Sequence, residues 1–136
     1  MLKAQAPGVE VICVQPLGAP AMTYSWRQRR VVTTGPPSTI ADGVAGRCPI
    51  PAVLDDLLLV ADDAVQVQEA SIIAGMRLLL EHAGLVAEPS AALGIAAILE
   101  GRARFAGRHV VTIVCGGNVD LDAYHRWIGA APARQP

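Results

Sequence analysis

The spacing of apolar positions along this chain predicts short strands that alternate with helices. Residues 9–14 (VEVICV) form a run rich in β-branched side chains between Pro-Gly and Pro, which is typical of a mostly buried strand. Residues 64–67 (AVQV) indicate a short second strand, and residues 109–115 (HVVTIVC) indicate another buried one. Alternation of this kind predicts an α/β fold with a largely parallel sheet.

The clearest helix covers residues 69–83, where apolar side chains follow helical spacing and Gly84 stands where a left-handed C-cap belongs. Further helices are predicted at 19–30, at 49–60 and at 121–128, the last capped by Asp120. Residues 35–38 (GPPS) break regular structure, and 39–46 are too irregular for a helix or a strand. Residues 90–100 predict a helix that is apolar on every face and therefore buried on all sides.

The composition is more apolar than a chain of this size requires. Of the 136 residues, 52% are hydrophobic and only 17% are charged, and a small domain buries a smaller fraction of its surface than a large one. Either the chain associates through an apolar face or it belongs to a larger fold, and we favour the second explanation. Residues 1–129 are expected to form the folded part, and residues 130–136 a disordered tail.

Charge and cysteine usage exclude several classes of function. A net charge of −1 gives no basic surface for nucleic acid or anionic lipid. Apolar stretches such as 91–99 are too short to span a bilayer, and no signal peptide is indicated. The three cysteines are widely spaced, which argues against a zinc site or a disulfide framework. We therefore expect a cytoplasmic protein with no membrane or nucleic-acid partner.

One junction of predicted elements has the form of a ligand site. Residues 115–120 (CGGNVD) place Gly116 and Gly117 between a strand and a helix, and parallel sheets bind ligands at the carboxyl ends of their strands. Taken alone, Gly-Gly after a strand is more often just a tight turn, and a lone cysteine such as Cys115 is most often a buried core thiol.

The order of three motifs is more specific than any one of them. TIADG (39–43), EPSAALG (88–94) and CGGNVD (115–120), with the Asp-Asp pair at 62–63 and the helix AGMRLLLEHAG (74–84), follow one another along the chain. This series resembles the C-terminal part of the pyridoxal-phosphate (PLP) dependent serine/threonine dehydratases, a group that includes threonine ammonia-lyases and serine racemases. The resemblance runs from about residue 9 to about residue 127. It implies the C-terminal half of the large domain of a fold-type II PLP enzyme, a partial parallel sheet flanked by helices.

The resemblance also assigns cofactor-binding residues. Cys115 stands where the family has a serine or cysteine facing the pyridine nitrogen of PLP, which a thiol can hydrogen-bond without protonating it. Glu88 matches a glutamate beside the cofactor ring, although a carboxylate at a helix N-terminus explains it equally well. Gly43 matches the loop that lines the pocket, or it supplies a backbone turn. Gly116 and Gly117 complete the set.

Other family features are missing from the sequence. The family's Schiff-base lysine and Gly-rich phosphate loop have no counterpart, since the only lysine is Lys3 and no tetraglycine-like run occurs. The chain is expected to start just after that loop, to have no catalytic residue of its own and to be inactive alone. The acidic metal ligands of many relatives are replaced by Gln15 and the apolar residues 17–22, so no metal is predicted.

The sequence thus predicts part of a PLP-dependent hydroxy-amino-acid ammonia-lyase that contributes the cofactor-ring side of the pocket. The intact parent would bind PLP and an amino acid substrate, serine or threonine, and would form a homo-oligomer or join this chain with a complementing N-terminal half. Two alternatives stay open: a non-catalytic scaffold that binds itself or a partner through apolar surface, and a small anion-binding module that uses the Gly116-Gly117 turn. The sequence does not distinguish dehydration from racemisation.

Overall fold

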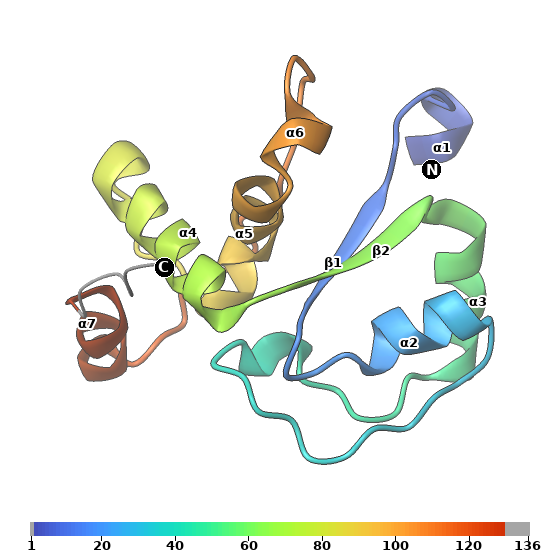
Figure 1. The fold of residues 1–136 in the computed structure, drawn as a ribbon, viewed down its shortest axis with the longest axis horizontal. Coiled ribbons are helices and arrows are strands. Elements are labelled where there is room, and N and C mark those ends of the chain that lie inside the picture. Colours follow the sequence, from blue (N-terminus) through green and yellow to red (C-terminus); the bar gives the residue numbers. More distant parts are fainter. Residues whose placement is uncertain (1, 130–136) are drawn as a thin grey trace.

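The computed structural model describes residues 2–129 and is an α/β structure (Figure 1). Its two strands are β1 (Ile12–Pro16) and β2 (Asp63–Val67). Two short 3-10 turns are η1 (Asp42–Val44) and η2 (Pro89–Ala92). The α-helices are α1 (Leu2–Gln5), α2 (Ala21–Gln28), α3 (Pro51–Val60), α4 (Glu69–Ala83), α5 (Leu93–Glu100), α6 (Arg102–Phe105) and α7 (Leu121–Gly129).

The two strands form a parallel pair in which Ile12 lies opposite Asp63 and Pro16 lies opposite Val67. A parallel pair needs a long crossover, and here α2, η1 and α3 provide it. Helices α2 and α5 each contact both strands, and α4 leaves directly from the end of β2 (Figure 1). The carboxyl ends of β1 and β2 therefore face η1 and the start of α4.

The hydrophobic core lies between α4, α5, η2 and α7. Ile72 and Met76 of α4 are completely buried, and Tyr124 of α7 is 2% exposed. Arg77 fastens α7 to this core, because its guanidinium donates to the carbonyl oxygens of Trp127 and Ile128 at 3.2 and 2.7 Å. This side of the molecule is packed like an ordinary domain interior.

Most of the predicted elements are found. Helix α4 spans the predicted residues, and Gly84 ends it with φ 66°, a left-handed conformation that glycine adopts without strain. Asp120 accepts a hydrogen bond from the Ala123 amide at 2.8 Å and so caps α7 as predicted. The parallel pairing of β1 and β2 confirms the predicted fold class.

Strand β1 begins three residues later than the predicted range 9–14. The backbone before it is held by the turn ahead of β2 instead of by strand pairing. The Val11 amide donates to the Asp62 carboxylate at 2.7 Å, and the Val11 carbonyl accepts from the Asp62 amide at 2.8 Å.

The prediction of a buried strand at 109–115 is wrong for this structure. The segment is extended, but in the described part of the chain it pairs with neither strand, and Val111 and Ile113 are 92% and 81% exposed. The apolar helix predicted at 90–100 is divided into η2 and α5 and is only partly buried, since Ile95, Ile98 and Leu99 are half-exposed. The exposure has one physical reason: within residues 2–129, no further layer of structure covers these side chains.

No helix within residues 2–129 combines the length and the apolar character that crossing a membrane requires. The tail predicted at 130–136 lies outside the described residues.

Candidate functional site

Three segments that are far apart in sequence meet beside the carboxyl ends of the strands. The Glu88 amide, just before η2, donates to the Gly116 carbonyl at 3.1 Å. On the other side of the same segment, η2 packs against η1. The segment 86–92 therefore connects the TIADG and CGGNVD motifs and brings all three predicted motifs into one neighbourhood.

Three glycines in this neighbourhood leave no space for a side chain. A Cβ at Gly116 would lie 2.8 Å from Oε1 of Glu88, and one at Gly117 would lie 2.6 Å from the Val86 carbonyl oxygen. A Cβ at Gly43 would lie 2.8 Å from Oγ of Ser90. At Gly117 the neighbouring atom belongs to the backbone, so glycine is required there. At Gly116 and Gly43 the neighbouring atoms belong to the side chains of Glu88 and Ser90.

Glu88 and Cys115 are the two reactive side chains of the site. The half-buried Glu88 carboxylate packs over Gly116, while its backbone is tied to the same residue. Cys115, directly before Gly116, is an exposed free thiol. The structure therefore brings Glu88 beside the Gly116-Gly117 turn, and Gly43 joins them through Ser90 instead of by direct contact with the turn.

Ser90 is a site residue that the sequence reading did not single out. Its Oγ is buried and has no hydrogen-bond partner within the described structure. Buried hydroxyls are normally satisfied, so an unpartnered one marks either strain or a missing ligand. The only sequence signal for Ser90 was its place inside the EPSAALG motif.

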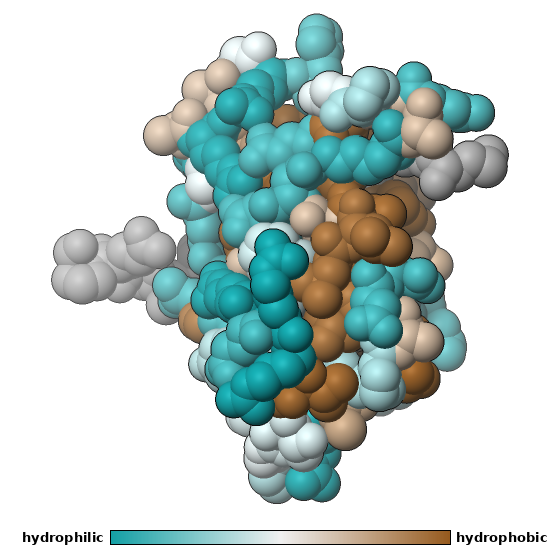
Figure 2. Space-filling view, turned by 90° about the vertical axis from the view of Figure 1, so that its right-hand side faces the viewer, coloured by the Kyte–Doolittle hydropathy of each residue, from teal (hydrophilic) through white to brown (hydrophobic). Residues whose placement is uncertain are grey.

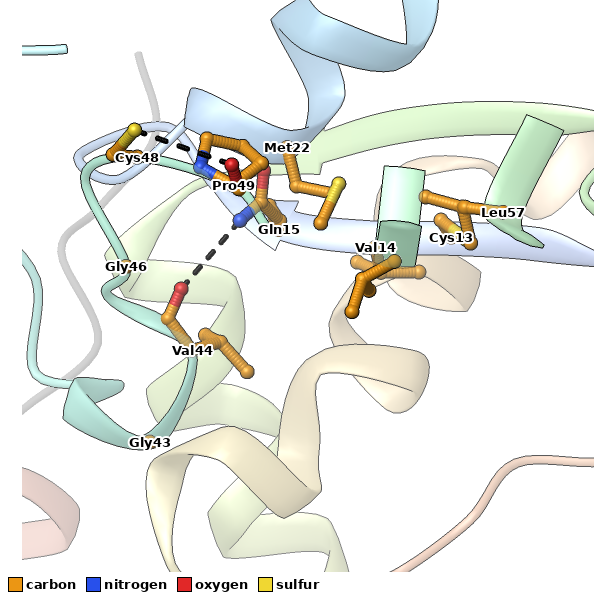
Figure 3. A pocket seen from close by; sticks show the side chains of 11 residues that line it. Cys13, Val14, Gln15, Met22, Gly43, Val44, Gly46, Cys48, Pro49 and Leu57 are labelled. Carbon is orange, nitrogen blue, oxygen red and sulfur yellow. Dashed lines mark hydrogen bonds between the residues drawn. The ribbon is translucent and has the colours of Figure 1, made fainter. Parts of the chain in front are cut away.

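Gln15 has a structural role where relatives were expected to bind metal. Its Oε1 accepts hydrogen bonds from the amide and the hydroxyl of Thr23, at 2.8 and 3.0 Å, and its Nε2 donates to the Val44 carbonyl at 3.5 Å (Figure 3). One amide thereby joins the end of β1, the start of α2 and η1. Within residues 2–129, no three His, Cys, Asp or Glu side chains are grouped so that they could hold a metal.

Next to η1 lies an apolar hollow of about 390 Å³ (Figure 3). Gly43 and Val44 border it on one side, and residues of β1, α2, α3 and the loop before α3 line the rest of this open hollow. Cys13 on its wall is half-buried, and this burial raises the pKa of the thiol. A neutral thiol at that place acts as a small apolar side chain.

Lys3, the only lysine of the chain, is far from this site. Its Nζ contacts the Asp62 carboxylate at 2.5 Å and the Val9 carbonyl oxygen at 2.8 Å. Asp62 precedes β2, whereas the site residues gather beyond the other end of the strands. The hydrogen bond from Lys3, together with one from the Val11 amide, lowers the pKa of Asp62. Lys3 is therefore engaged in an ion pair at the amino ends of the strands.

Comparisons with known proteins agree with the motifs. The family model described as "Pyridoxal-phosphate dependent enzyme" matches residues 1–116. An L-threonine ammonia-lyase of Thermotoga maritima is 34% identical over 127 residues, which are 93% of this chain and 31% of that relative. A beta-hydroxyaspartate dehydratase of Paracoccus denitrificans is 36% identical, over 89% of this chain and 38% of that protein.

Solved structures give the same result for the fold. Threonine deaminase isoform 2 of Solanum lycopersicum superposes with a TM-score of 0.86 and 27% identity, covering 94% of this chain and 36% of that one. Maize serine racemase has a TM-score of 0.81 and 27% identity, covering 91% of this chain and 39% of its own. These neighbours are fold-type II PLP enzymes.

The chain spans about a third of the length of the curated relatives that it matches. The matched family model covers most of the chain and includes four of the five predicted cofactor-binding residues, all but Gly117. The chain therefore belongs to the pyridoxal-phosphate dependent enzyme family, and what it matches is one part of the family's fold.

Proposed function

We propose that this chain forms the cofactor-ring side of the pocket of a PLP-dependent hydroxy-amino-acid ammonia-lyase and that it does not catalyse the reaction alone. The observation that carries the proposal is the convergence of η1, residues 86–92 and residues 115–117 around three closely packed glycines. The names of the relatives, a threonine ammonia-lyase and a hydroxyaspartate dehydratase, support the reaction class.

The residues present suit the ring side of such a site. Gly43, Gly116 and Gly117 let residues 86–90 pack closely against both turns, and the buried Ser90 hydroxyl offers an unused hydrogen bond. PLP, when bound, supplies an electron sink for loss of the α-proton and of the β-hydroxyl group. In this proposal the neutral Cys115 thiol donates a hydrogen bond to the ring nitrogen and keeps its proton. Glu88 lies beside the edge of the ring.

The residues for the remaining tasks are not at this site. A covalent link to PLP requires a lysine amine, and Lys3 is held in an ion pair at the opposite ends of the strands. A phosphate group requires a cradle of backbone amides, and no glycine-rich loop for that purpose occurs in the sequence. The proposal therefore assigns both tasks to the part of the fold that this chain does not span.

A chimera tests the proposal directly. The 127 matched residues of the Thermotoga maritima L-threonine ammonia-lyase are replaced by the matched residues of this chain. We expect the chimera to bind PLP, with the absorbance of a lysine-linked cofactor, and to release ammonia from serine or threonine. The isolated chain should do neither. A chimera that folds without binding PLP would contradict the proposal, as would turnover by the isolated chain.

Variants at Cys115 test its specific role within the chimera. Cys115→Ser keeps a neutral hydrogen-bonding group and should preserve most of the activity. Cys115→Ala removes that group, and we expect kcat to fall by about 10- to 100-fold with an altered cofactor spectrum, because the ring nitrogen loses its partner. Equal activities and spectra for the two variants would refute this role.

A further inference from the structure

The η1 turn, which carries Gly43, is too short to hold its own position. The Val44 amide donates to the Ala41 carbonyl at 3.2 Å, which closes the turn. The next amide, that of Ala45, donates to the Asp42 carbonyl at 3.0 Å. Single turns of 3-10 helix have poor hydrogen-bond geometry and little stability of their own. The place of Gly43 in the molecule is therefore set by contacts from other elements.

Glu69 holds the turn at its beginning. Its Oε2 accepts a hydrogen bond at 3.0 Å from the amide of Ile40, which stands two residues before η1. Glu69 is the first residue of α4 and follows closely on the end of β2, so its backbone belongs to the most regular part of the fold. The carboxylate thus connects the strand pair to the start of the turn.

The second oxygen of the Glu69 carboxylate has no structural partner. Oε1 is buried, and within residues 2–129 it makes no hydrogen bond. Burial of a carboxylate oxygen without a partner costs free energy. A negative charge in the first turn of α4 is favourable through the helix dipole, but an exposed carboxylate would serve that purpose as well. The hydrogen bond to Ile40 is what gives the buried position of Glu69 a purpose.

Gln15 holds the turn at its end. Its Nε2 donates to the Val44 carbonyl at 3.5 Å, and Figure 3 shows this contact on the turn that carries Gly43. The amide is fixed on its other side, because Oε1 accepts from the amide and the hydroxyl of Thr23 at 2.8 and 3.0 Å. A distance of 3.5 Å is long for a hydrogen bond, so this contact is the weaker of the two.

Between these two contacts, Gly43 lies against Ser90. A Cβ at Gly43 would lie 2.8 Å from the Ser90 Oγ, which is buried and has no partner within the described residues. Because closely packed groups transmit small displacements, a shift of η1 would change the surroundings of this hydroxyl. The contacts at the two ends of the turn therefore determine the shape of this part of the site.

We propose that Glu69 and Gln15 are positioning residues that hold η1 from its two ends and so set the place of Gly43 against Ser90 on the ring side of the cofactor pocket. The proposal rests on the proposed function, because it assigns η1 to the wall of that pocket. Neither residue touches the ring. Glu69 makes the larger contribution, since its hydrogen bond is shorter and charge-assisted.

Amide hydrogen exchange of the present chain tests the contact at Glu69 without any cofactor. Glu69→Ala removes the acceptor, so the Ile40 amide should exchange at least about tenfold faster. Glu69→Gln keeps an oxygen acceptor and should stay within about twofold of the parent chain. Both variants lose the charge at the start of α4, so a role in the helix dipole alone would make them alike. Equal Ile40 exchange in the two variants would overturn the proposal. Glu81→Ala, at an exposed position of the same helix, is the control.

The PLP-loaded chimera tests the consequence for the cofactor site. Visible circular dichroism of bound PLP reports the orientation of its ring independently of turnover. We expect Glu69→Ala to change this dichroism and to weaken PLP binding by about tenfold, whereas Glu69→Gln retains both. Glu81→Ala should match the unmodified chimera. A Glu69→Ala chimera with unchanged dichroism and affinity would refute the positioning role.

A second variant tests the other end of the turn and remains informative where Glu69→Ala does not fold. Gln15→Glu keeps both bonds from Thr23 but places an oxygen instead of the Nε2 donor against the Val44 carbonyl. With a chelator present, so that no divalent cation bridges the two oxygens, the Val44 and Ala45 amides should exchange about threefold faster or more. Gln28→Glu, at an exposed position of α2, adds the same charge and should behave as the parent chain. Unchanged exchange at Val44 and Ala45 in Gln15→Glu would also overturn the proposal.

The two kinds of measurement separate this proposal from the proposed function. A chimera that folds but binds no PLP, beside the expected exchange pattern in the isolated chain, would refute the proposed function alone. A chimera that binds PLP with the same dichroism in the unmodified, Glu69→Ala and Gln15→Glu forms would refute the positioning role alone.

Discussion

Two sides of this molecule differ sharply in how completely they bury their apolar side chains. Between α4, α5, η2 and α7 lies a covered core, in which Ile72 and Met76 have no exposed surface. On α3 only Leu54 is buried, while Val53, Leu59 and Val60 face solvent. Figure 2 shows an apolar band between polar residues on the face turned toward its viewer, the side on which α3 lies in Figure 1.

The comparison teaches that an apolar sequence does not by itself guarantee a buried core. On the covered side α4, α5, η2 and α7 pack against one another, so the apolar side chains between them are buried within the chain. Helix α3 and residues 109–115 carry sequences suited to burial without such a layer. Exposed apolar surface of this kind is typical of sites that bind proteins, membranes or ligands.

The largest expected effect contrasts the two sides directly. Ile72→Ala should lower the free energy of unfolding by about 2–5 kcal/mol, because it leaves a cavity in packed surroundings. Leu59→Ala removes a side chain that is 81% exposed and should change it by less than about 0.5 kcal/mol. Urea denaturation of both variants measures the difference, and equal losses would abolish the distinction between the sides.

A smaller effect is expected where η1 meets η2. Gly43→Ala would place a Cβ 2.8 Å from Ser90 Oγ, and we expect it to cost about 1 kcal/mol, partly offset by the stiffer unfolded chain. Ser90→Ala removes the buried unpartnered hydroxyl and should be neutral or stabilising. When Gly43→Ala is combined with Ser90→Ala, the loss of folding free energy caused by Gly43→Ala should disappear, because the Oγ that it meets is gone. Simple additivity in a thermal double-mutant cycle would contradict this contact.

The smallest effect concerns the ion pairs that join α6 to Glu10, just before β1, and to Asp63 at the start of β2. Arg104 contacts both Glu10 and Asp63. Its hydrogen bond is the main reason why the pKa of Glu10 is lowered. For Asp63, burial acts to raise the pKa, but hydrogen bonds from Arg104 and the Ala64 amide outweigh it, and the pKa is lowered.

A carboxyl group whose pKa is lower in the folded state stabilises the fold above its unfolded pKa, and this stability is lost as the pH falls through the folded value. We therefore expect a modest decline of the thermal midpoint below about pH 4.5, shallower in Arg104→Met. Arg102→Met, at an exposed position of the same helix, serves as the control. An identical slope in Arg104→Met would show that these pairs contribute nothing measurable.

The sequence predicted the elements whose signals are local. The helical spacing of α4, the left-handed glycine that ends it and the Asp120 cap all depend on neighbouring residues. The sequence also predicted that Glu88, Gly43 and the Gly116-Gly117 turn share a neighbourhood, but through a family resemblance and not through any local rule.

What could not be predicted depends on contacts distant in sequence. Pairing at 109–115 requires a neighbouring strand, and no local pattern reveals whether that neighbour exists. The role of Gln15 requires Thr23 and Val44 to come together in three dimensions. The unpartnered Ser90 hydroxyl is visible only once the surrounding backbone is placed.

The extended segment at 109–115 also sets a limit on how this polypeptide can be handled. A β-prone run of valine and isoleucine with free backbone edges is a template for fibrillar stacking when molecules crowd together. Arg104 and Arg108, just ahead of it, are already paired with Glu10 and Asp63, so little unpaired charge keeps neighbouring copies apart. Solubility should therefore fall as the protein concentration rises.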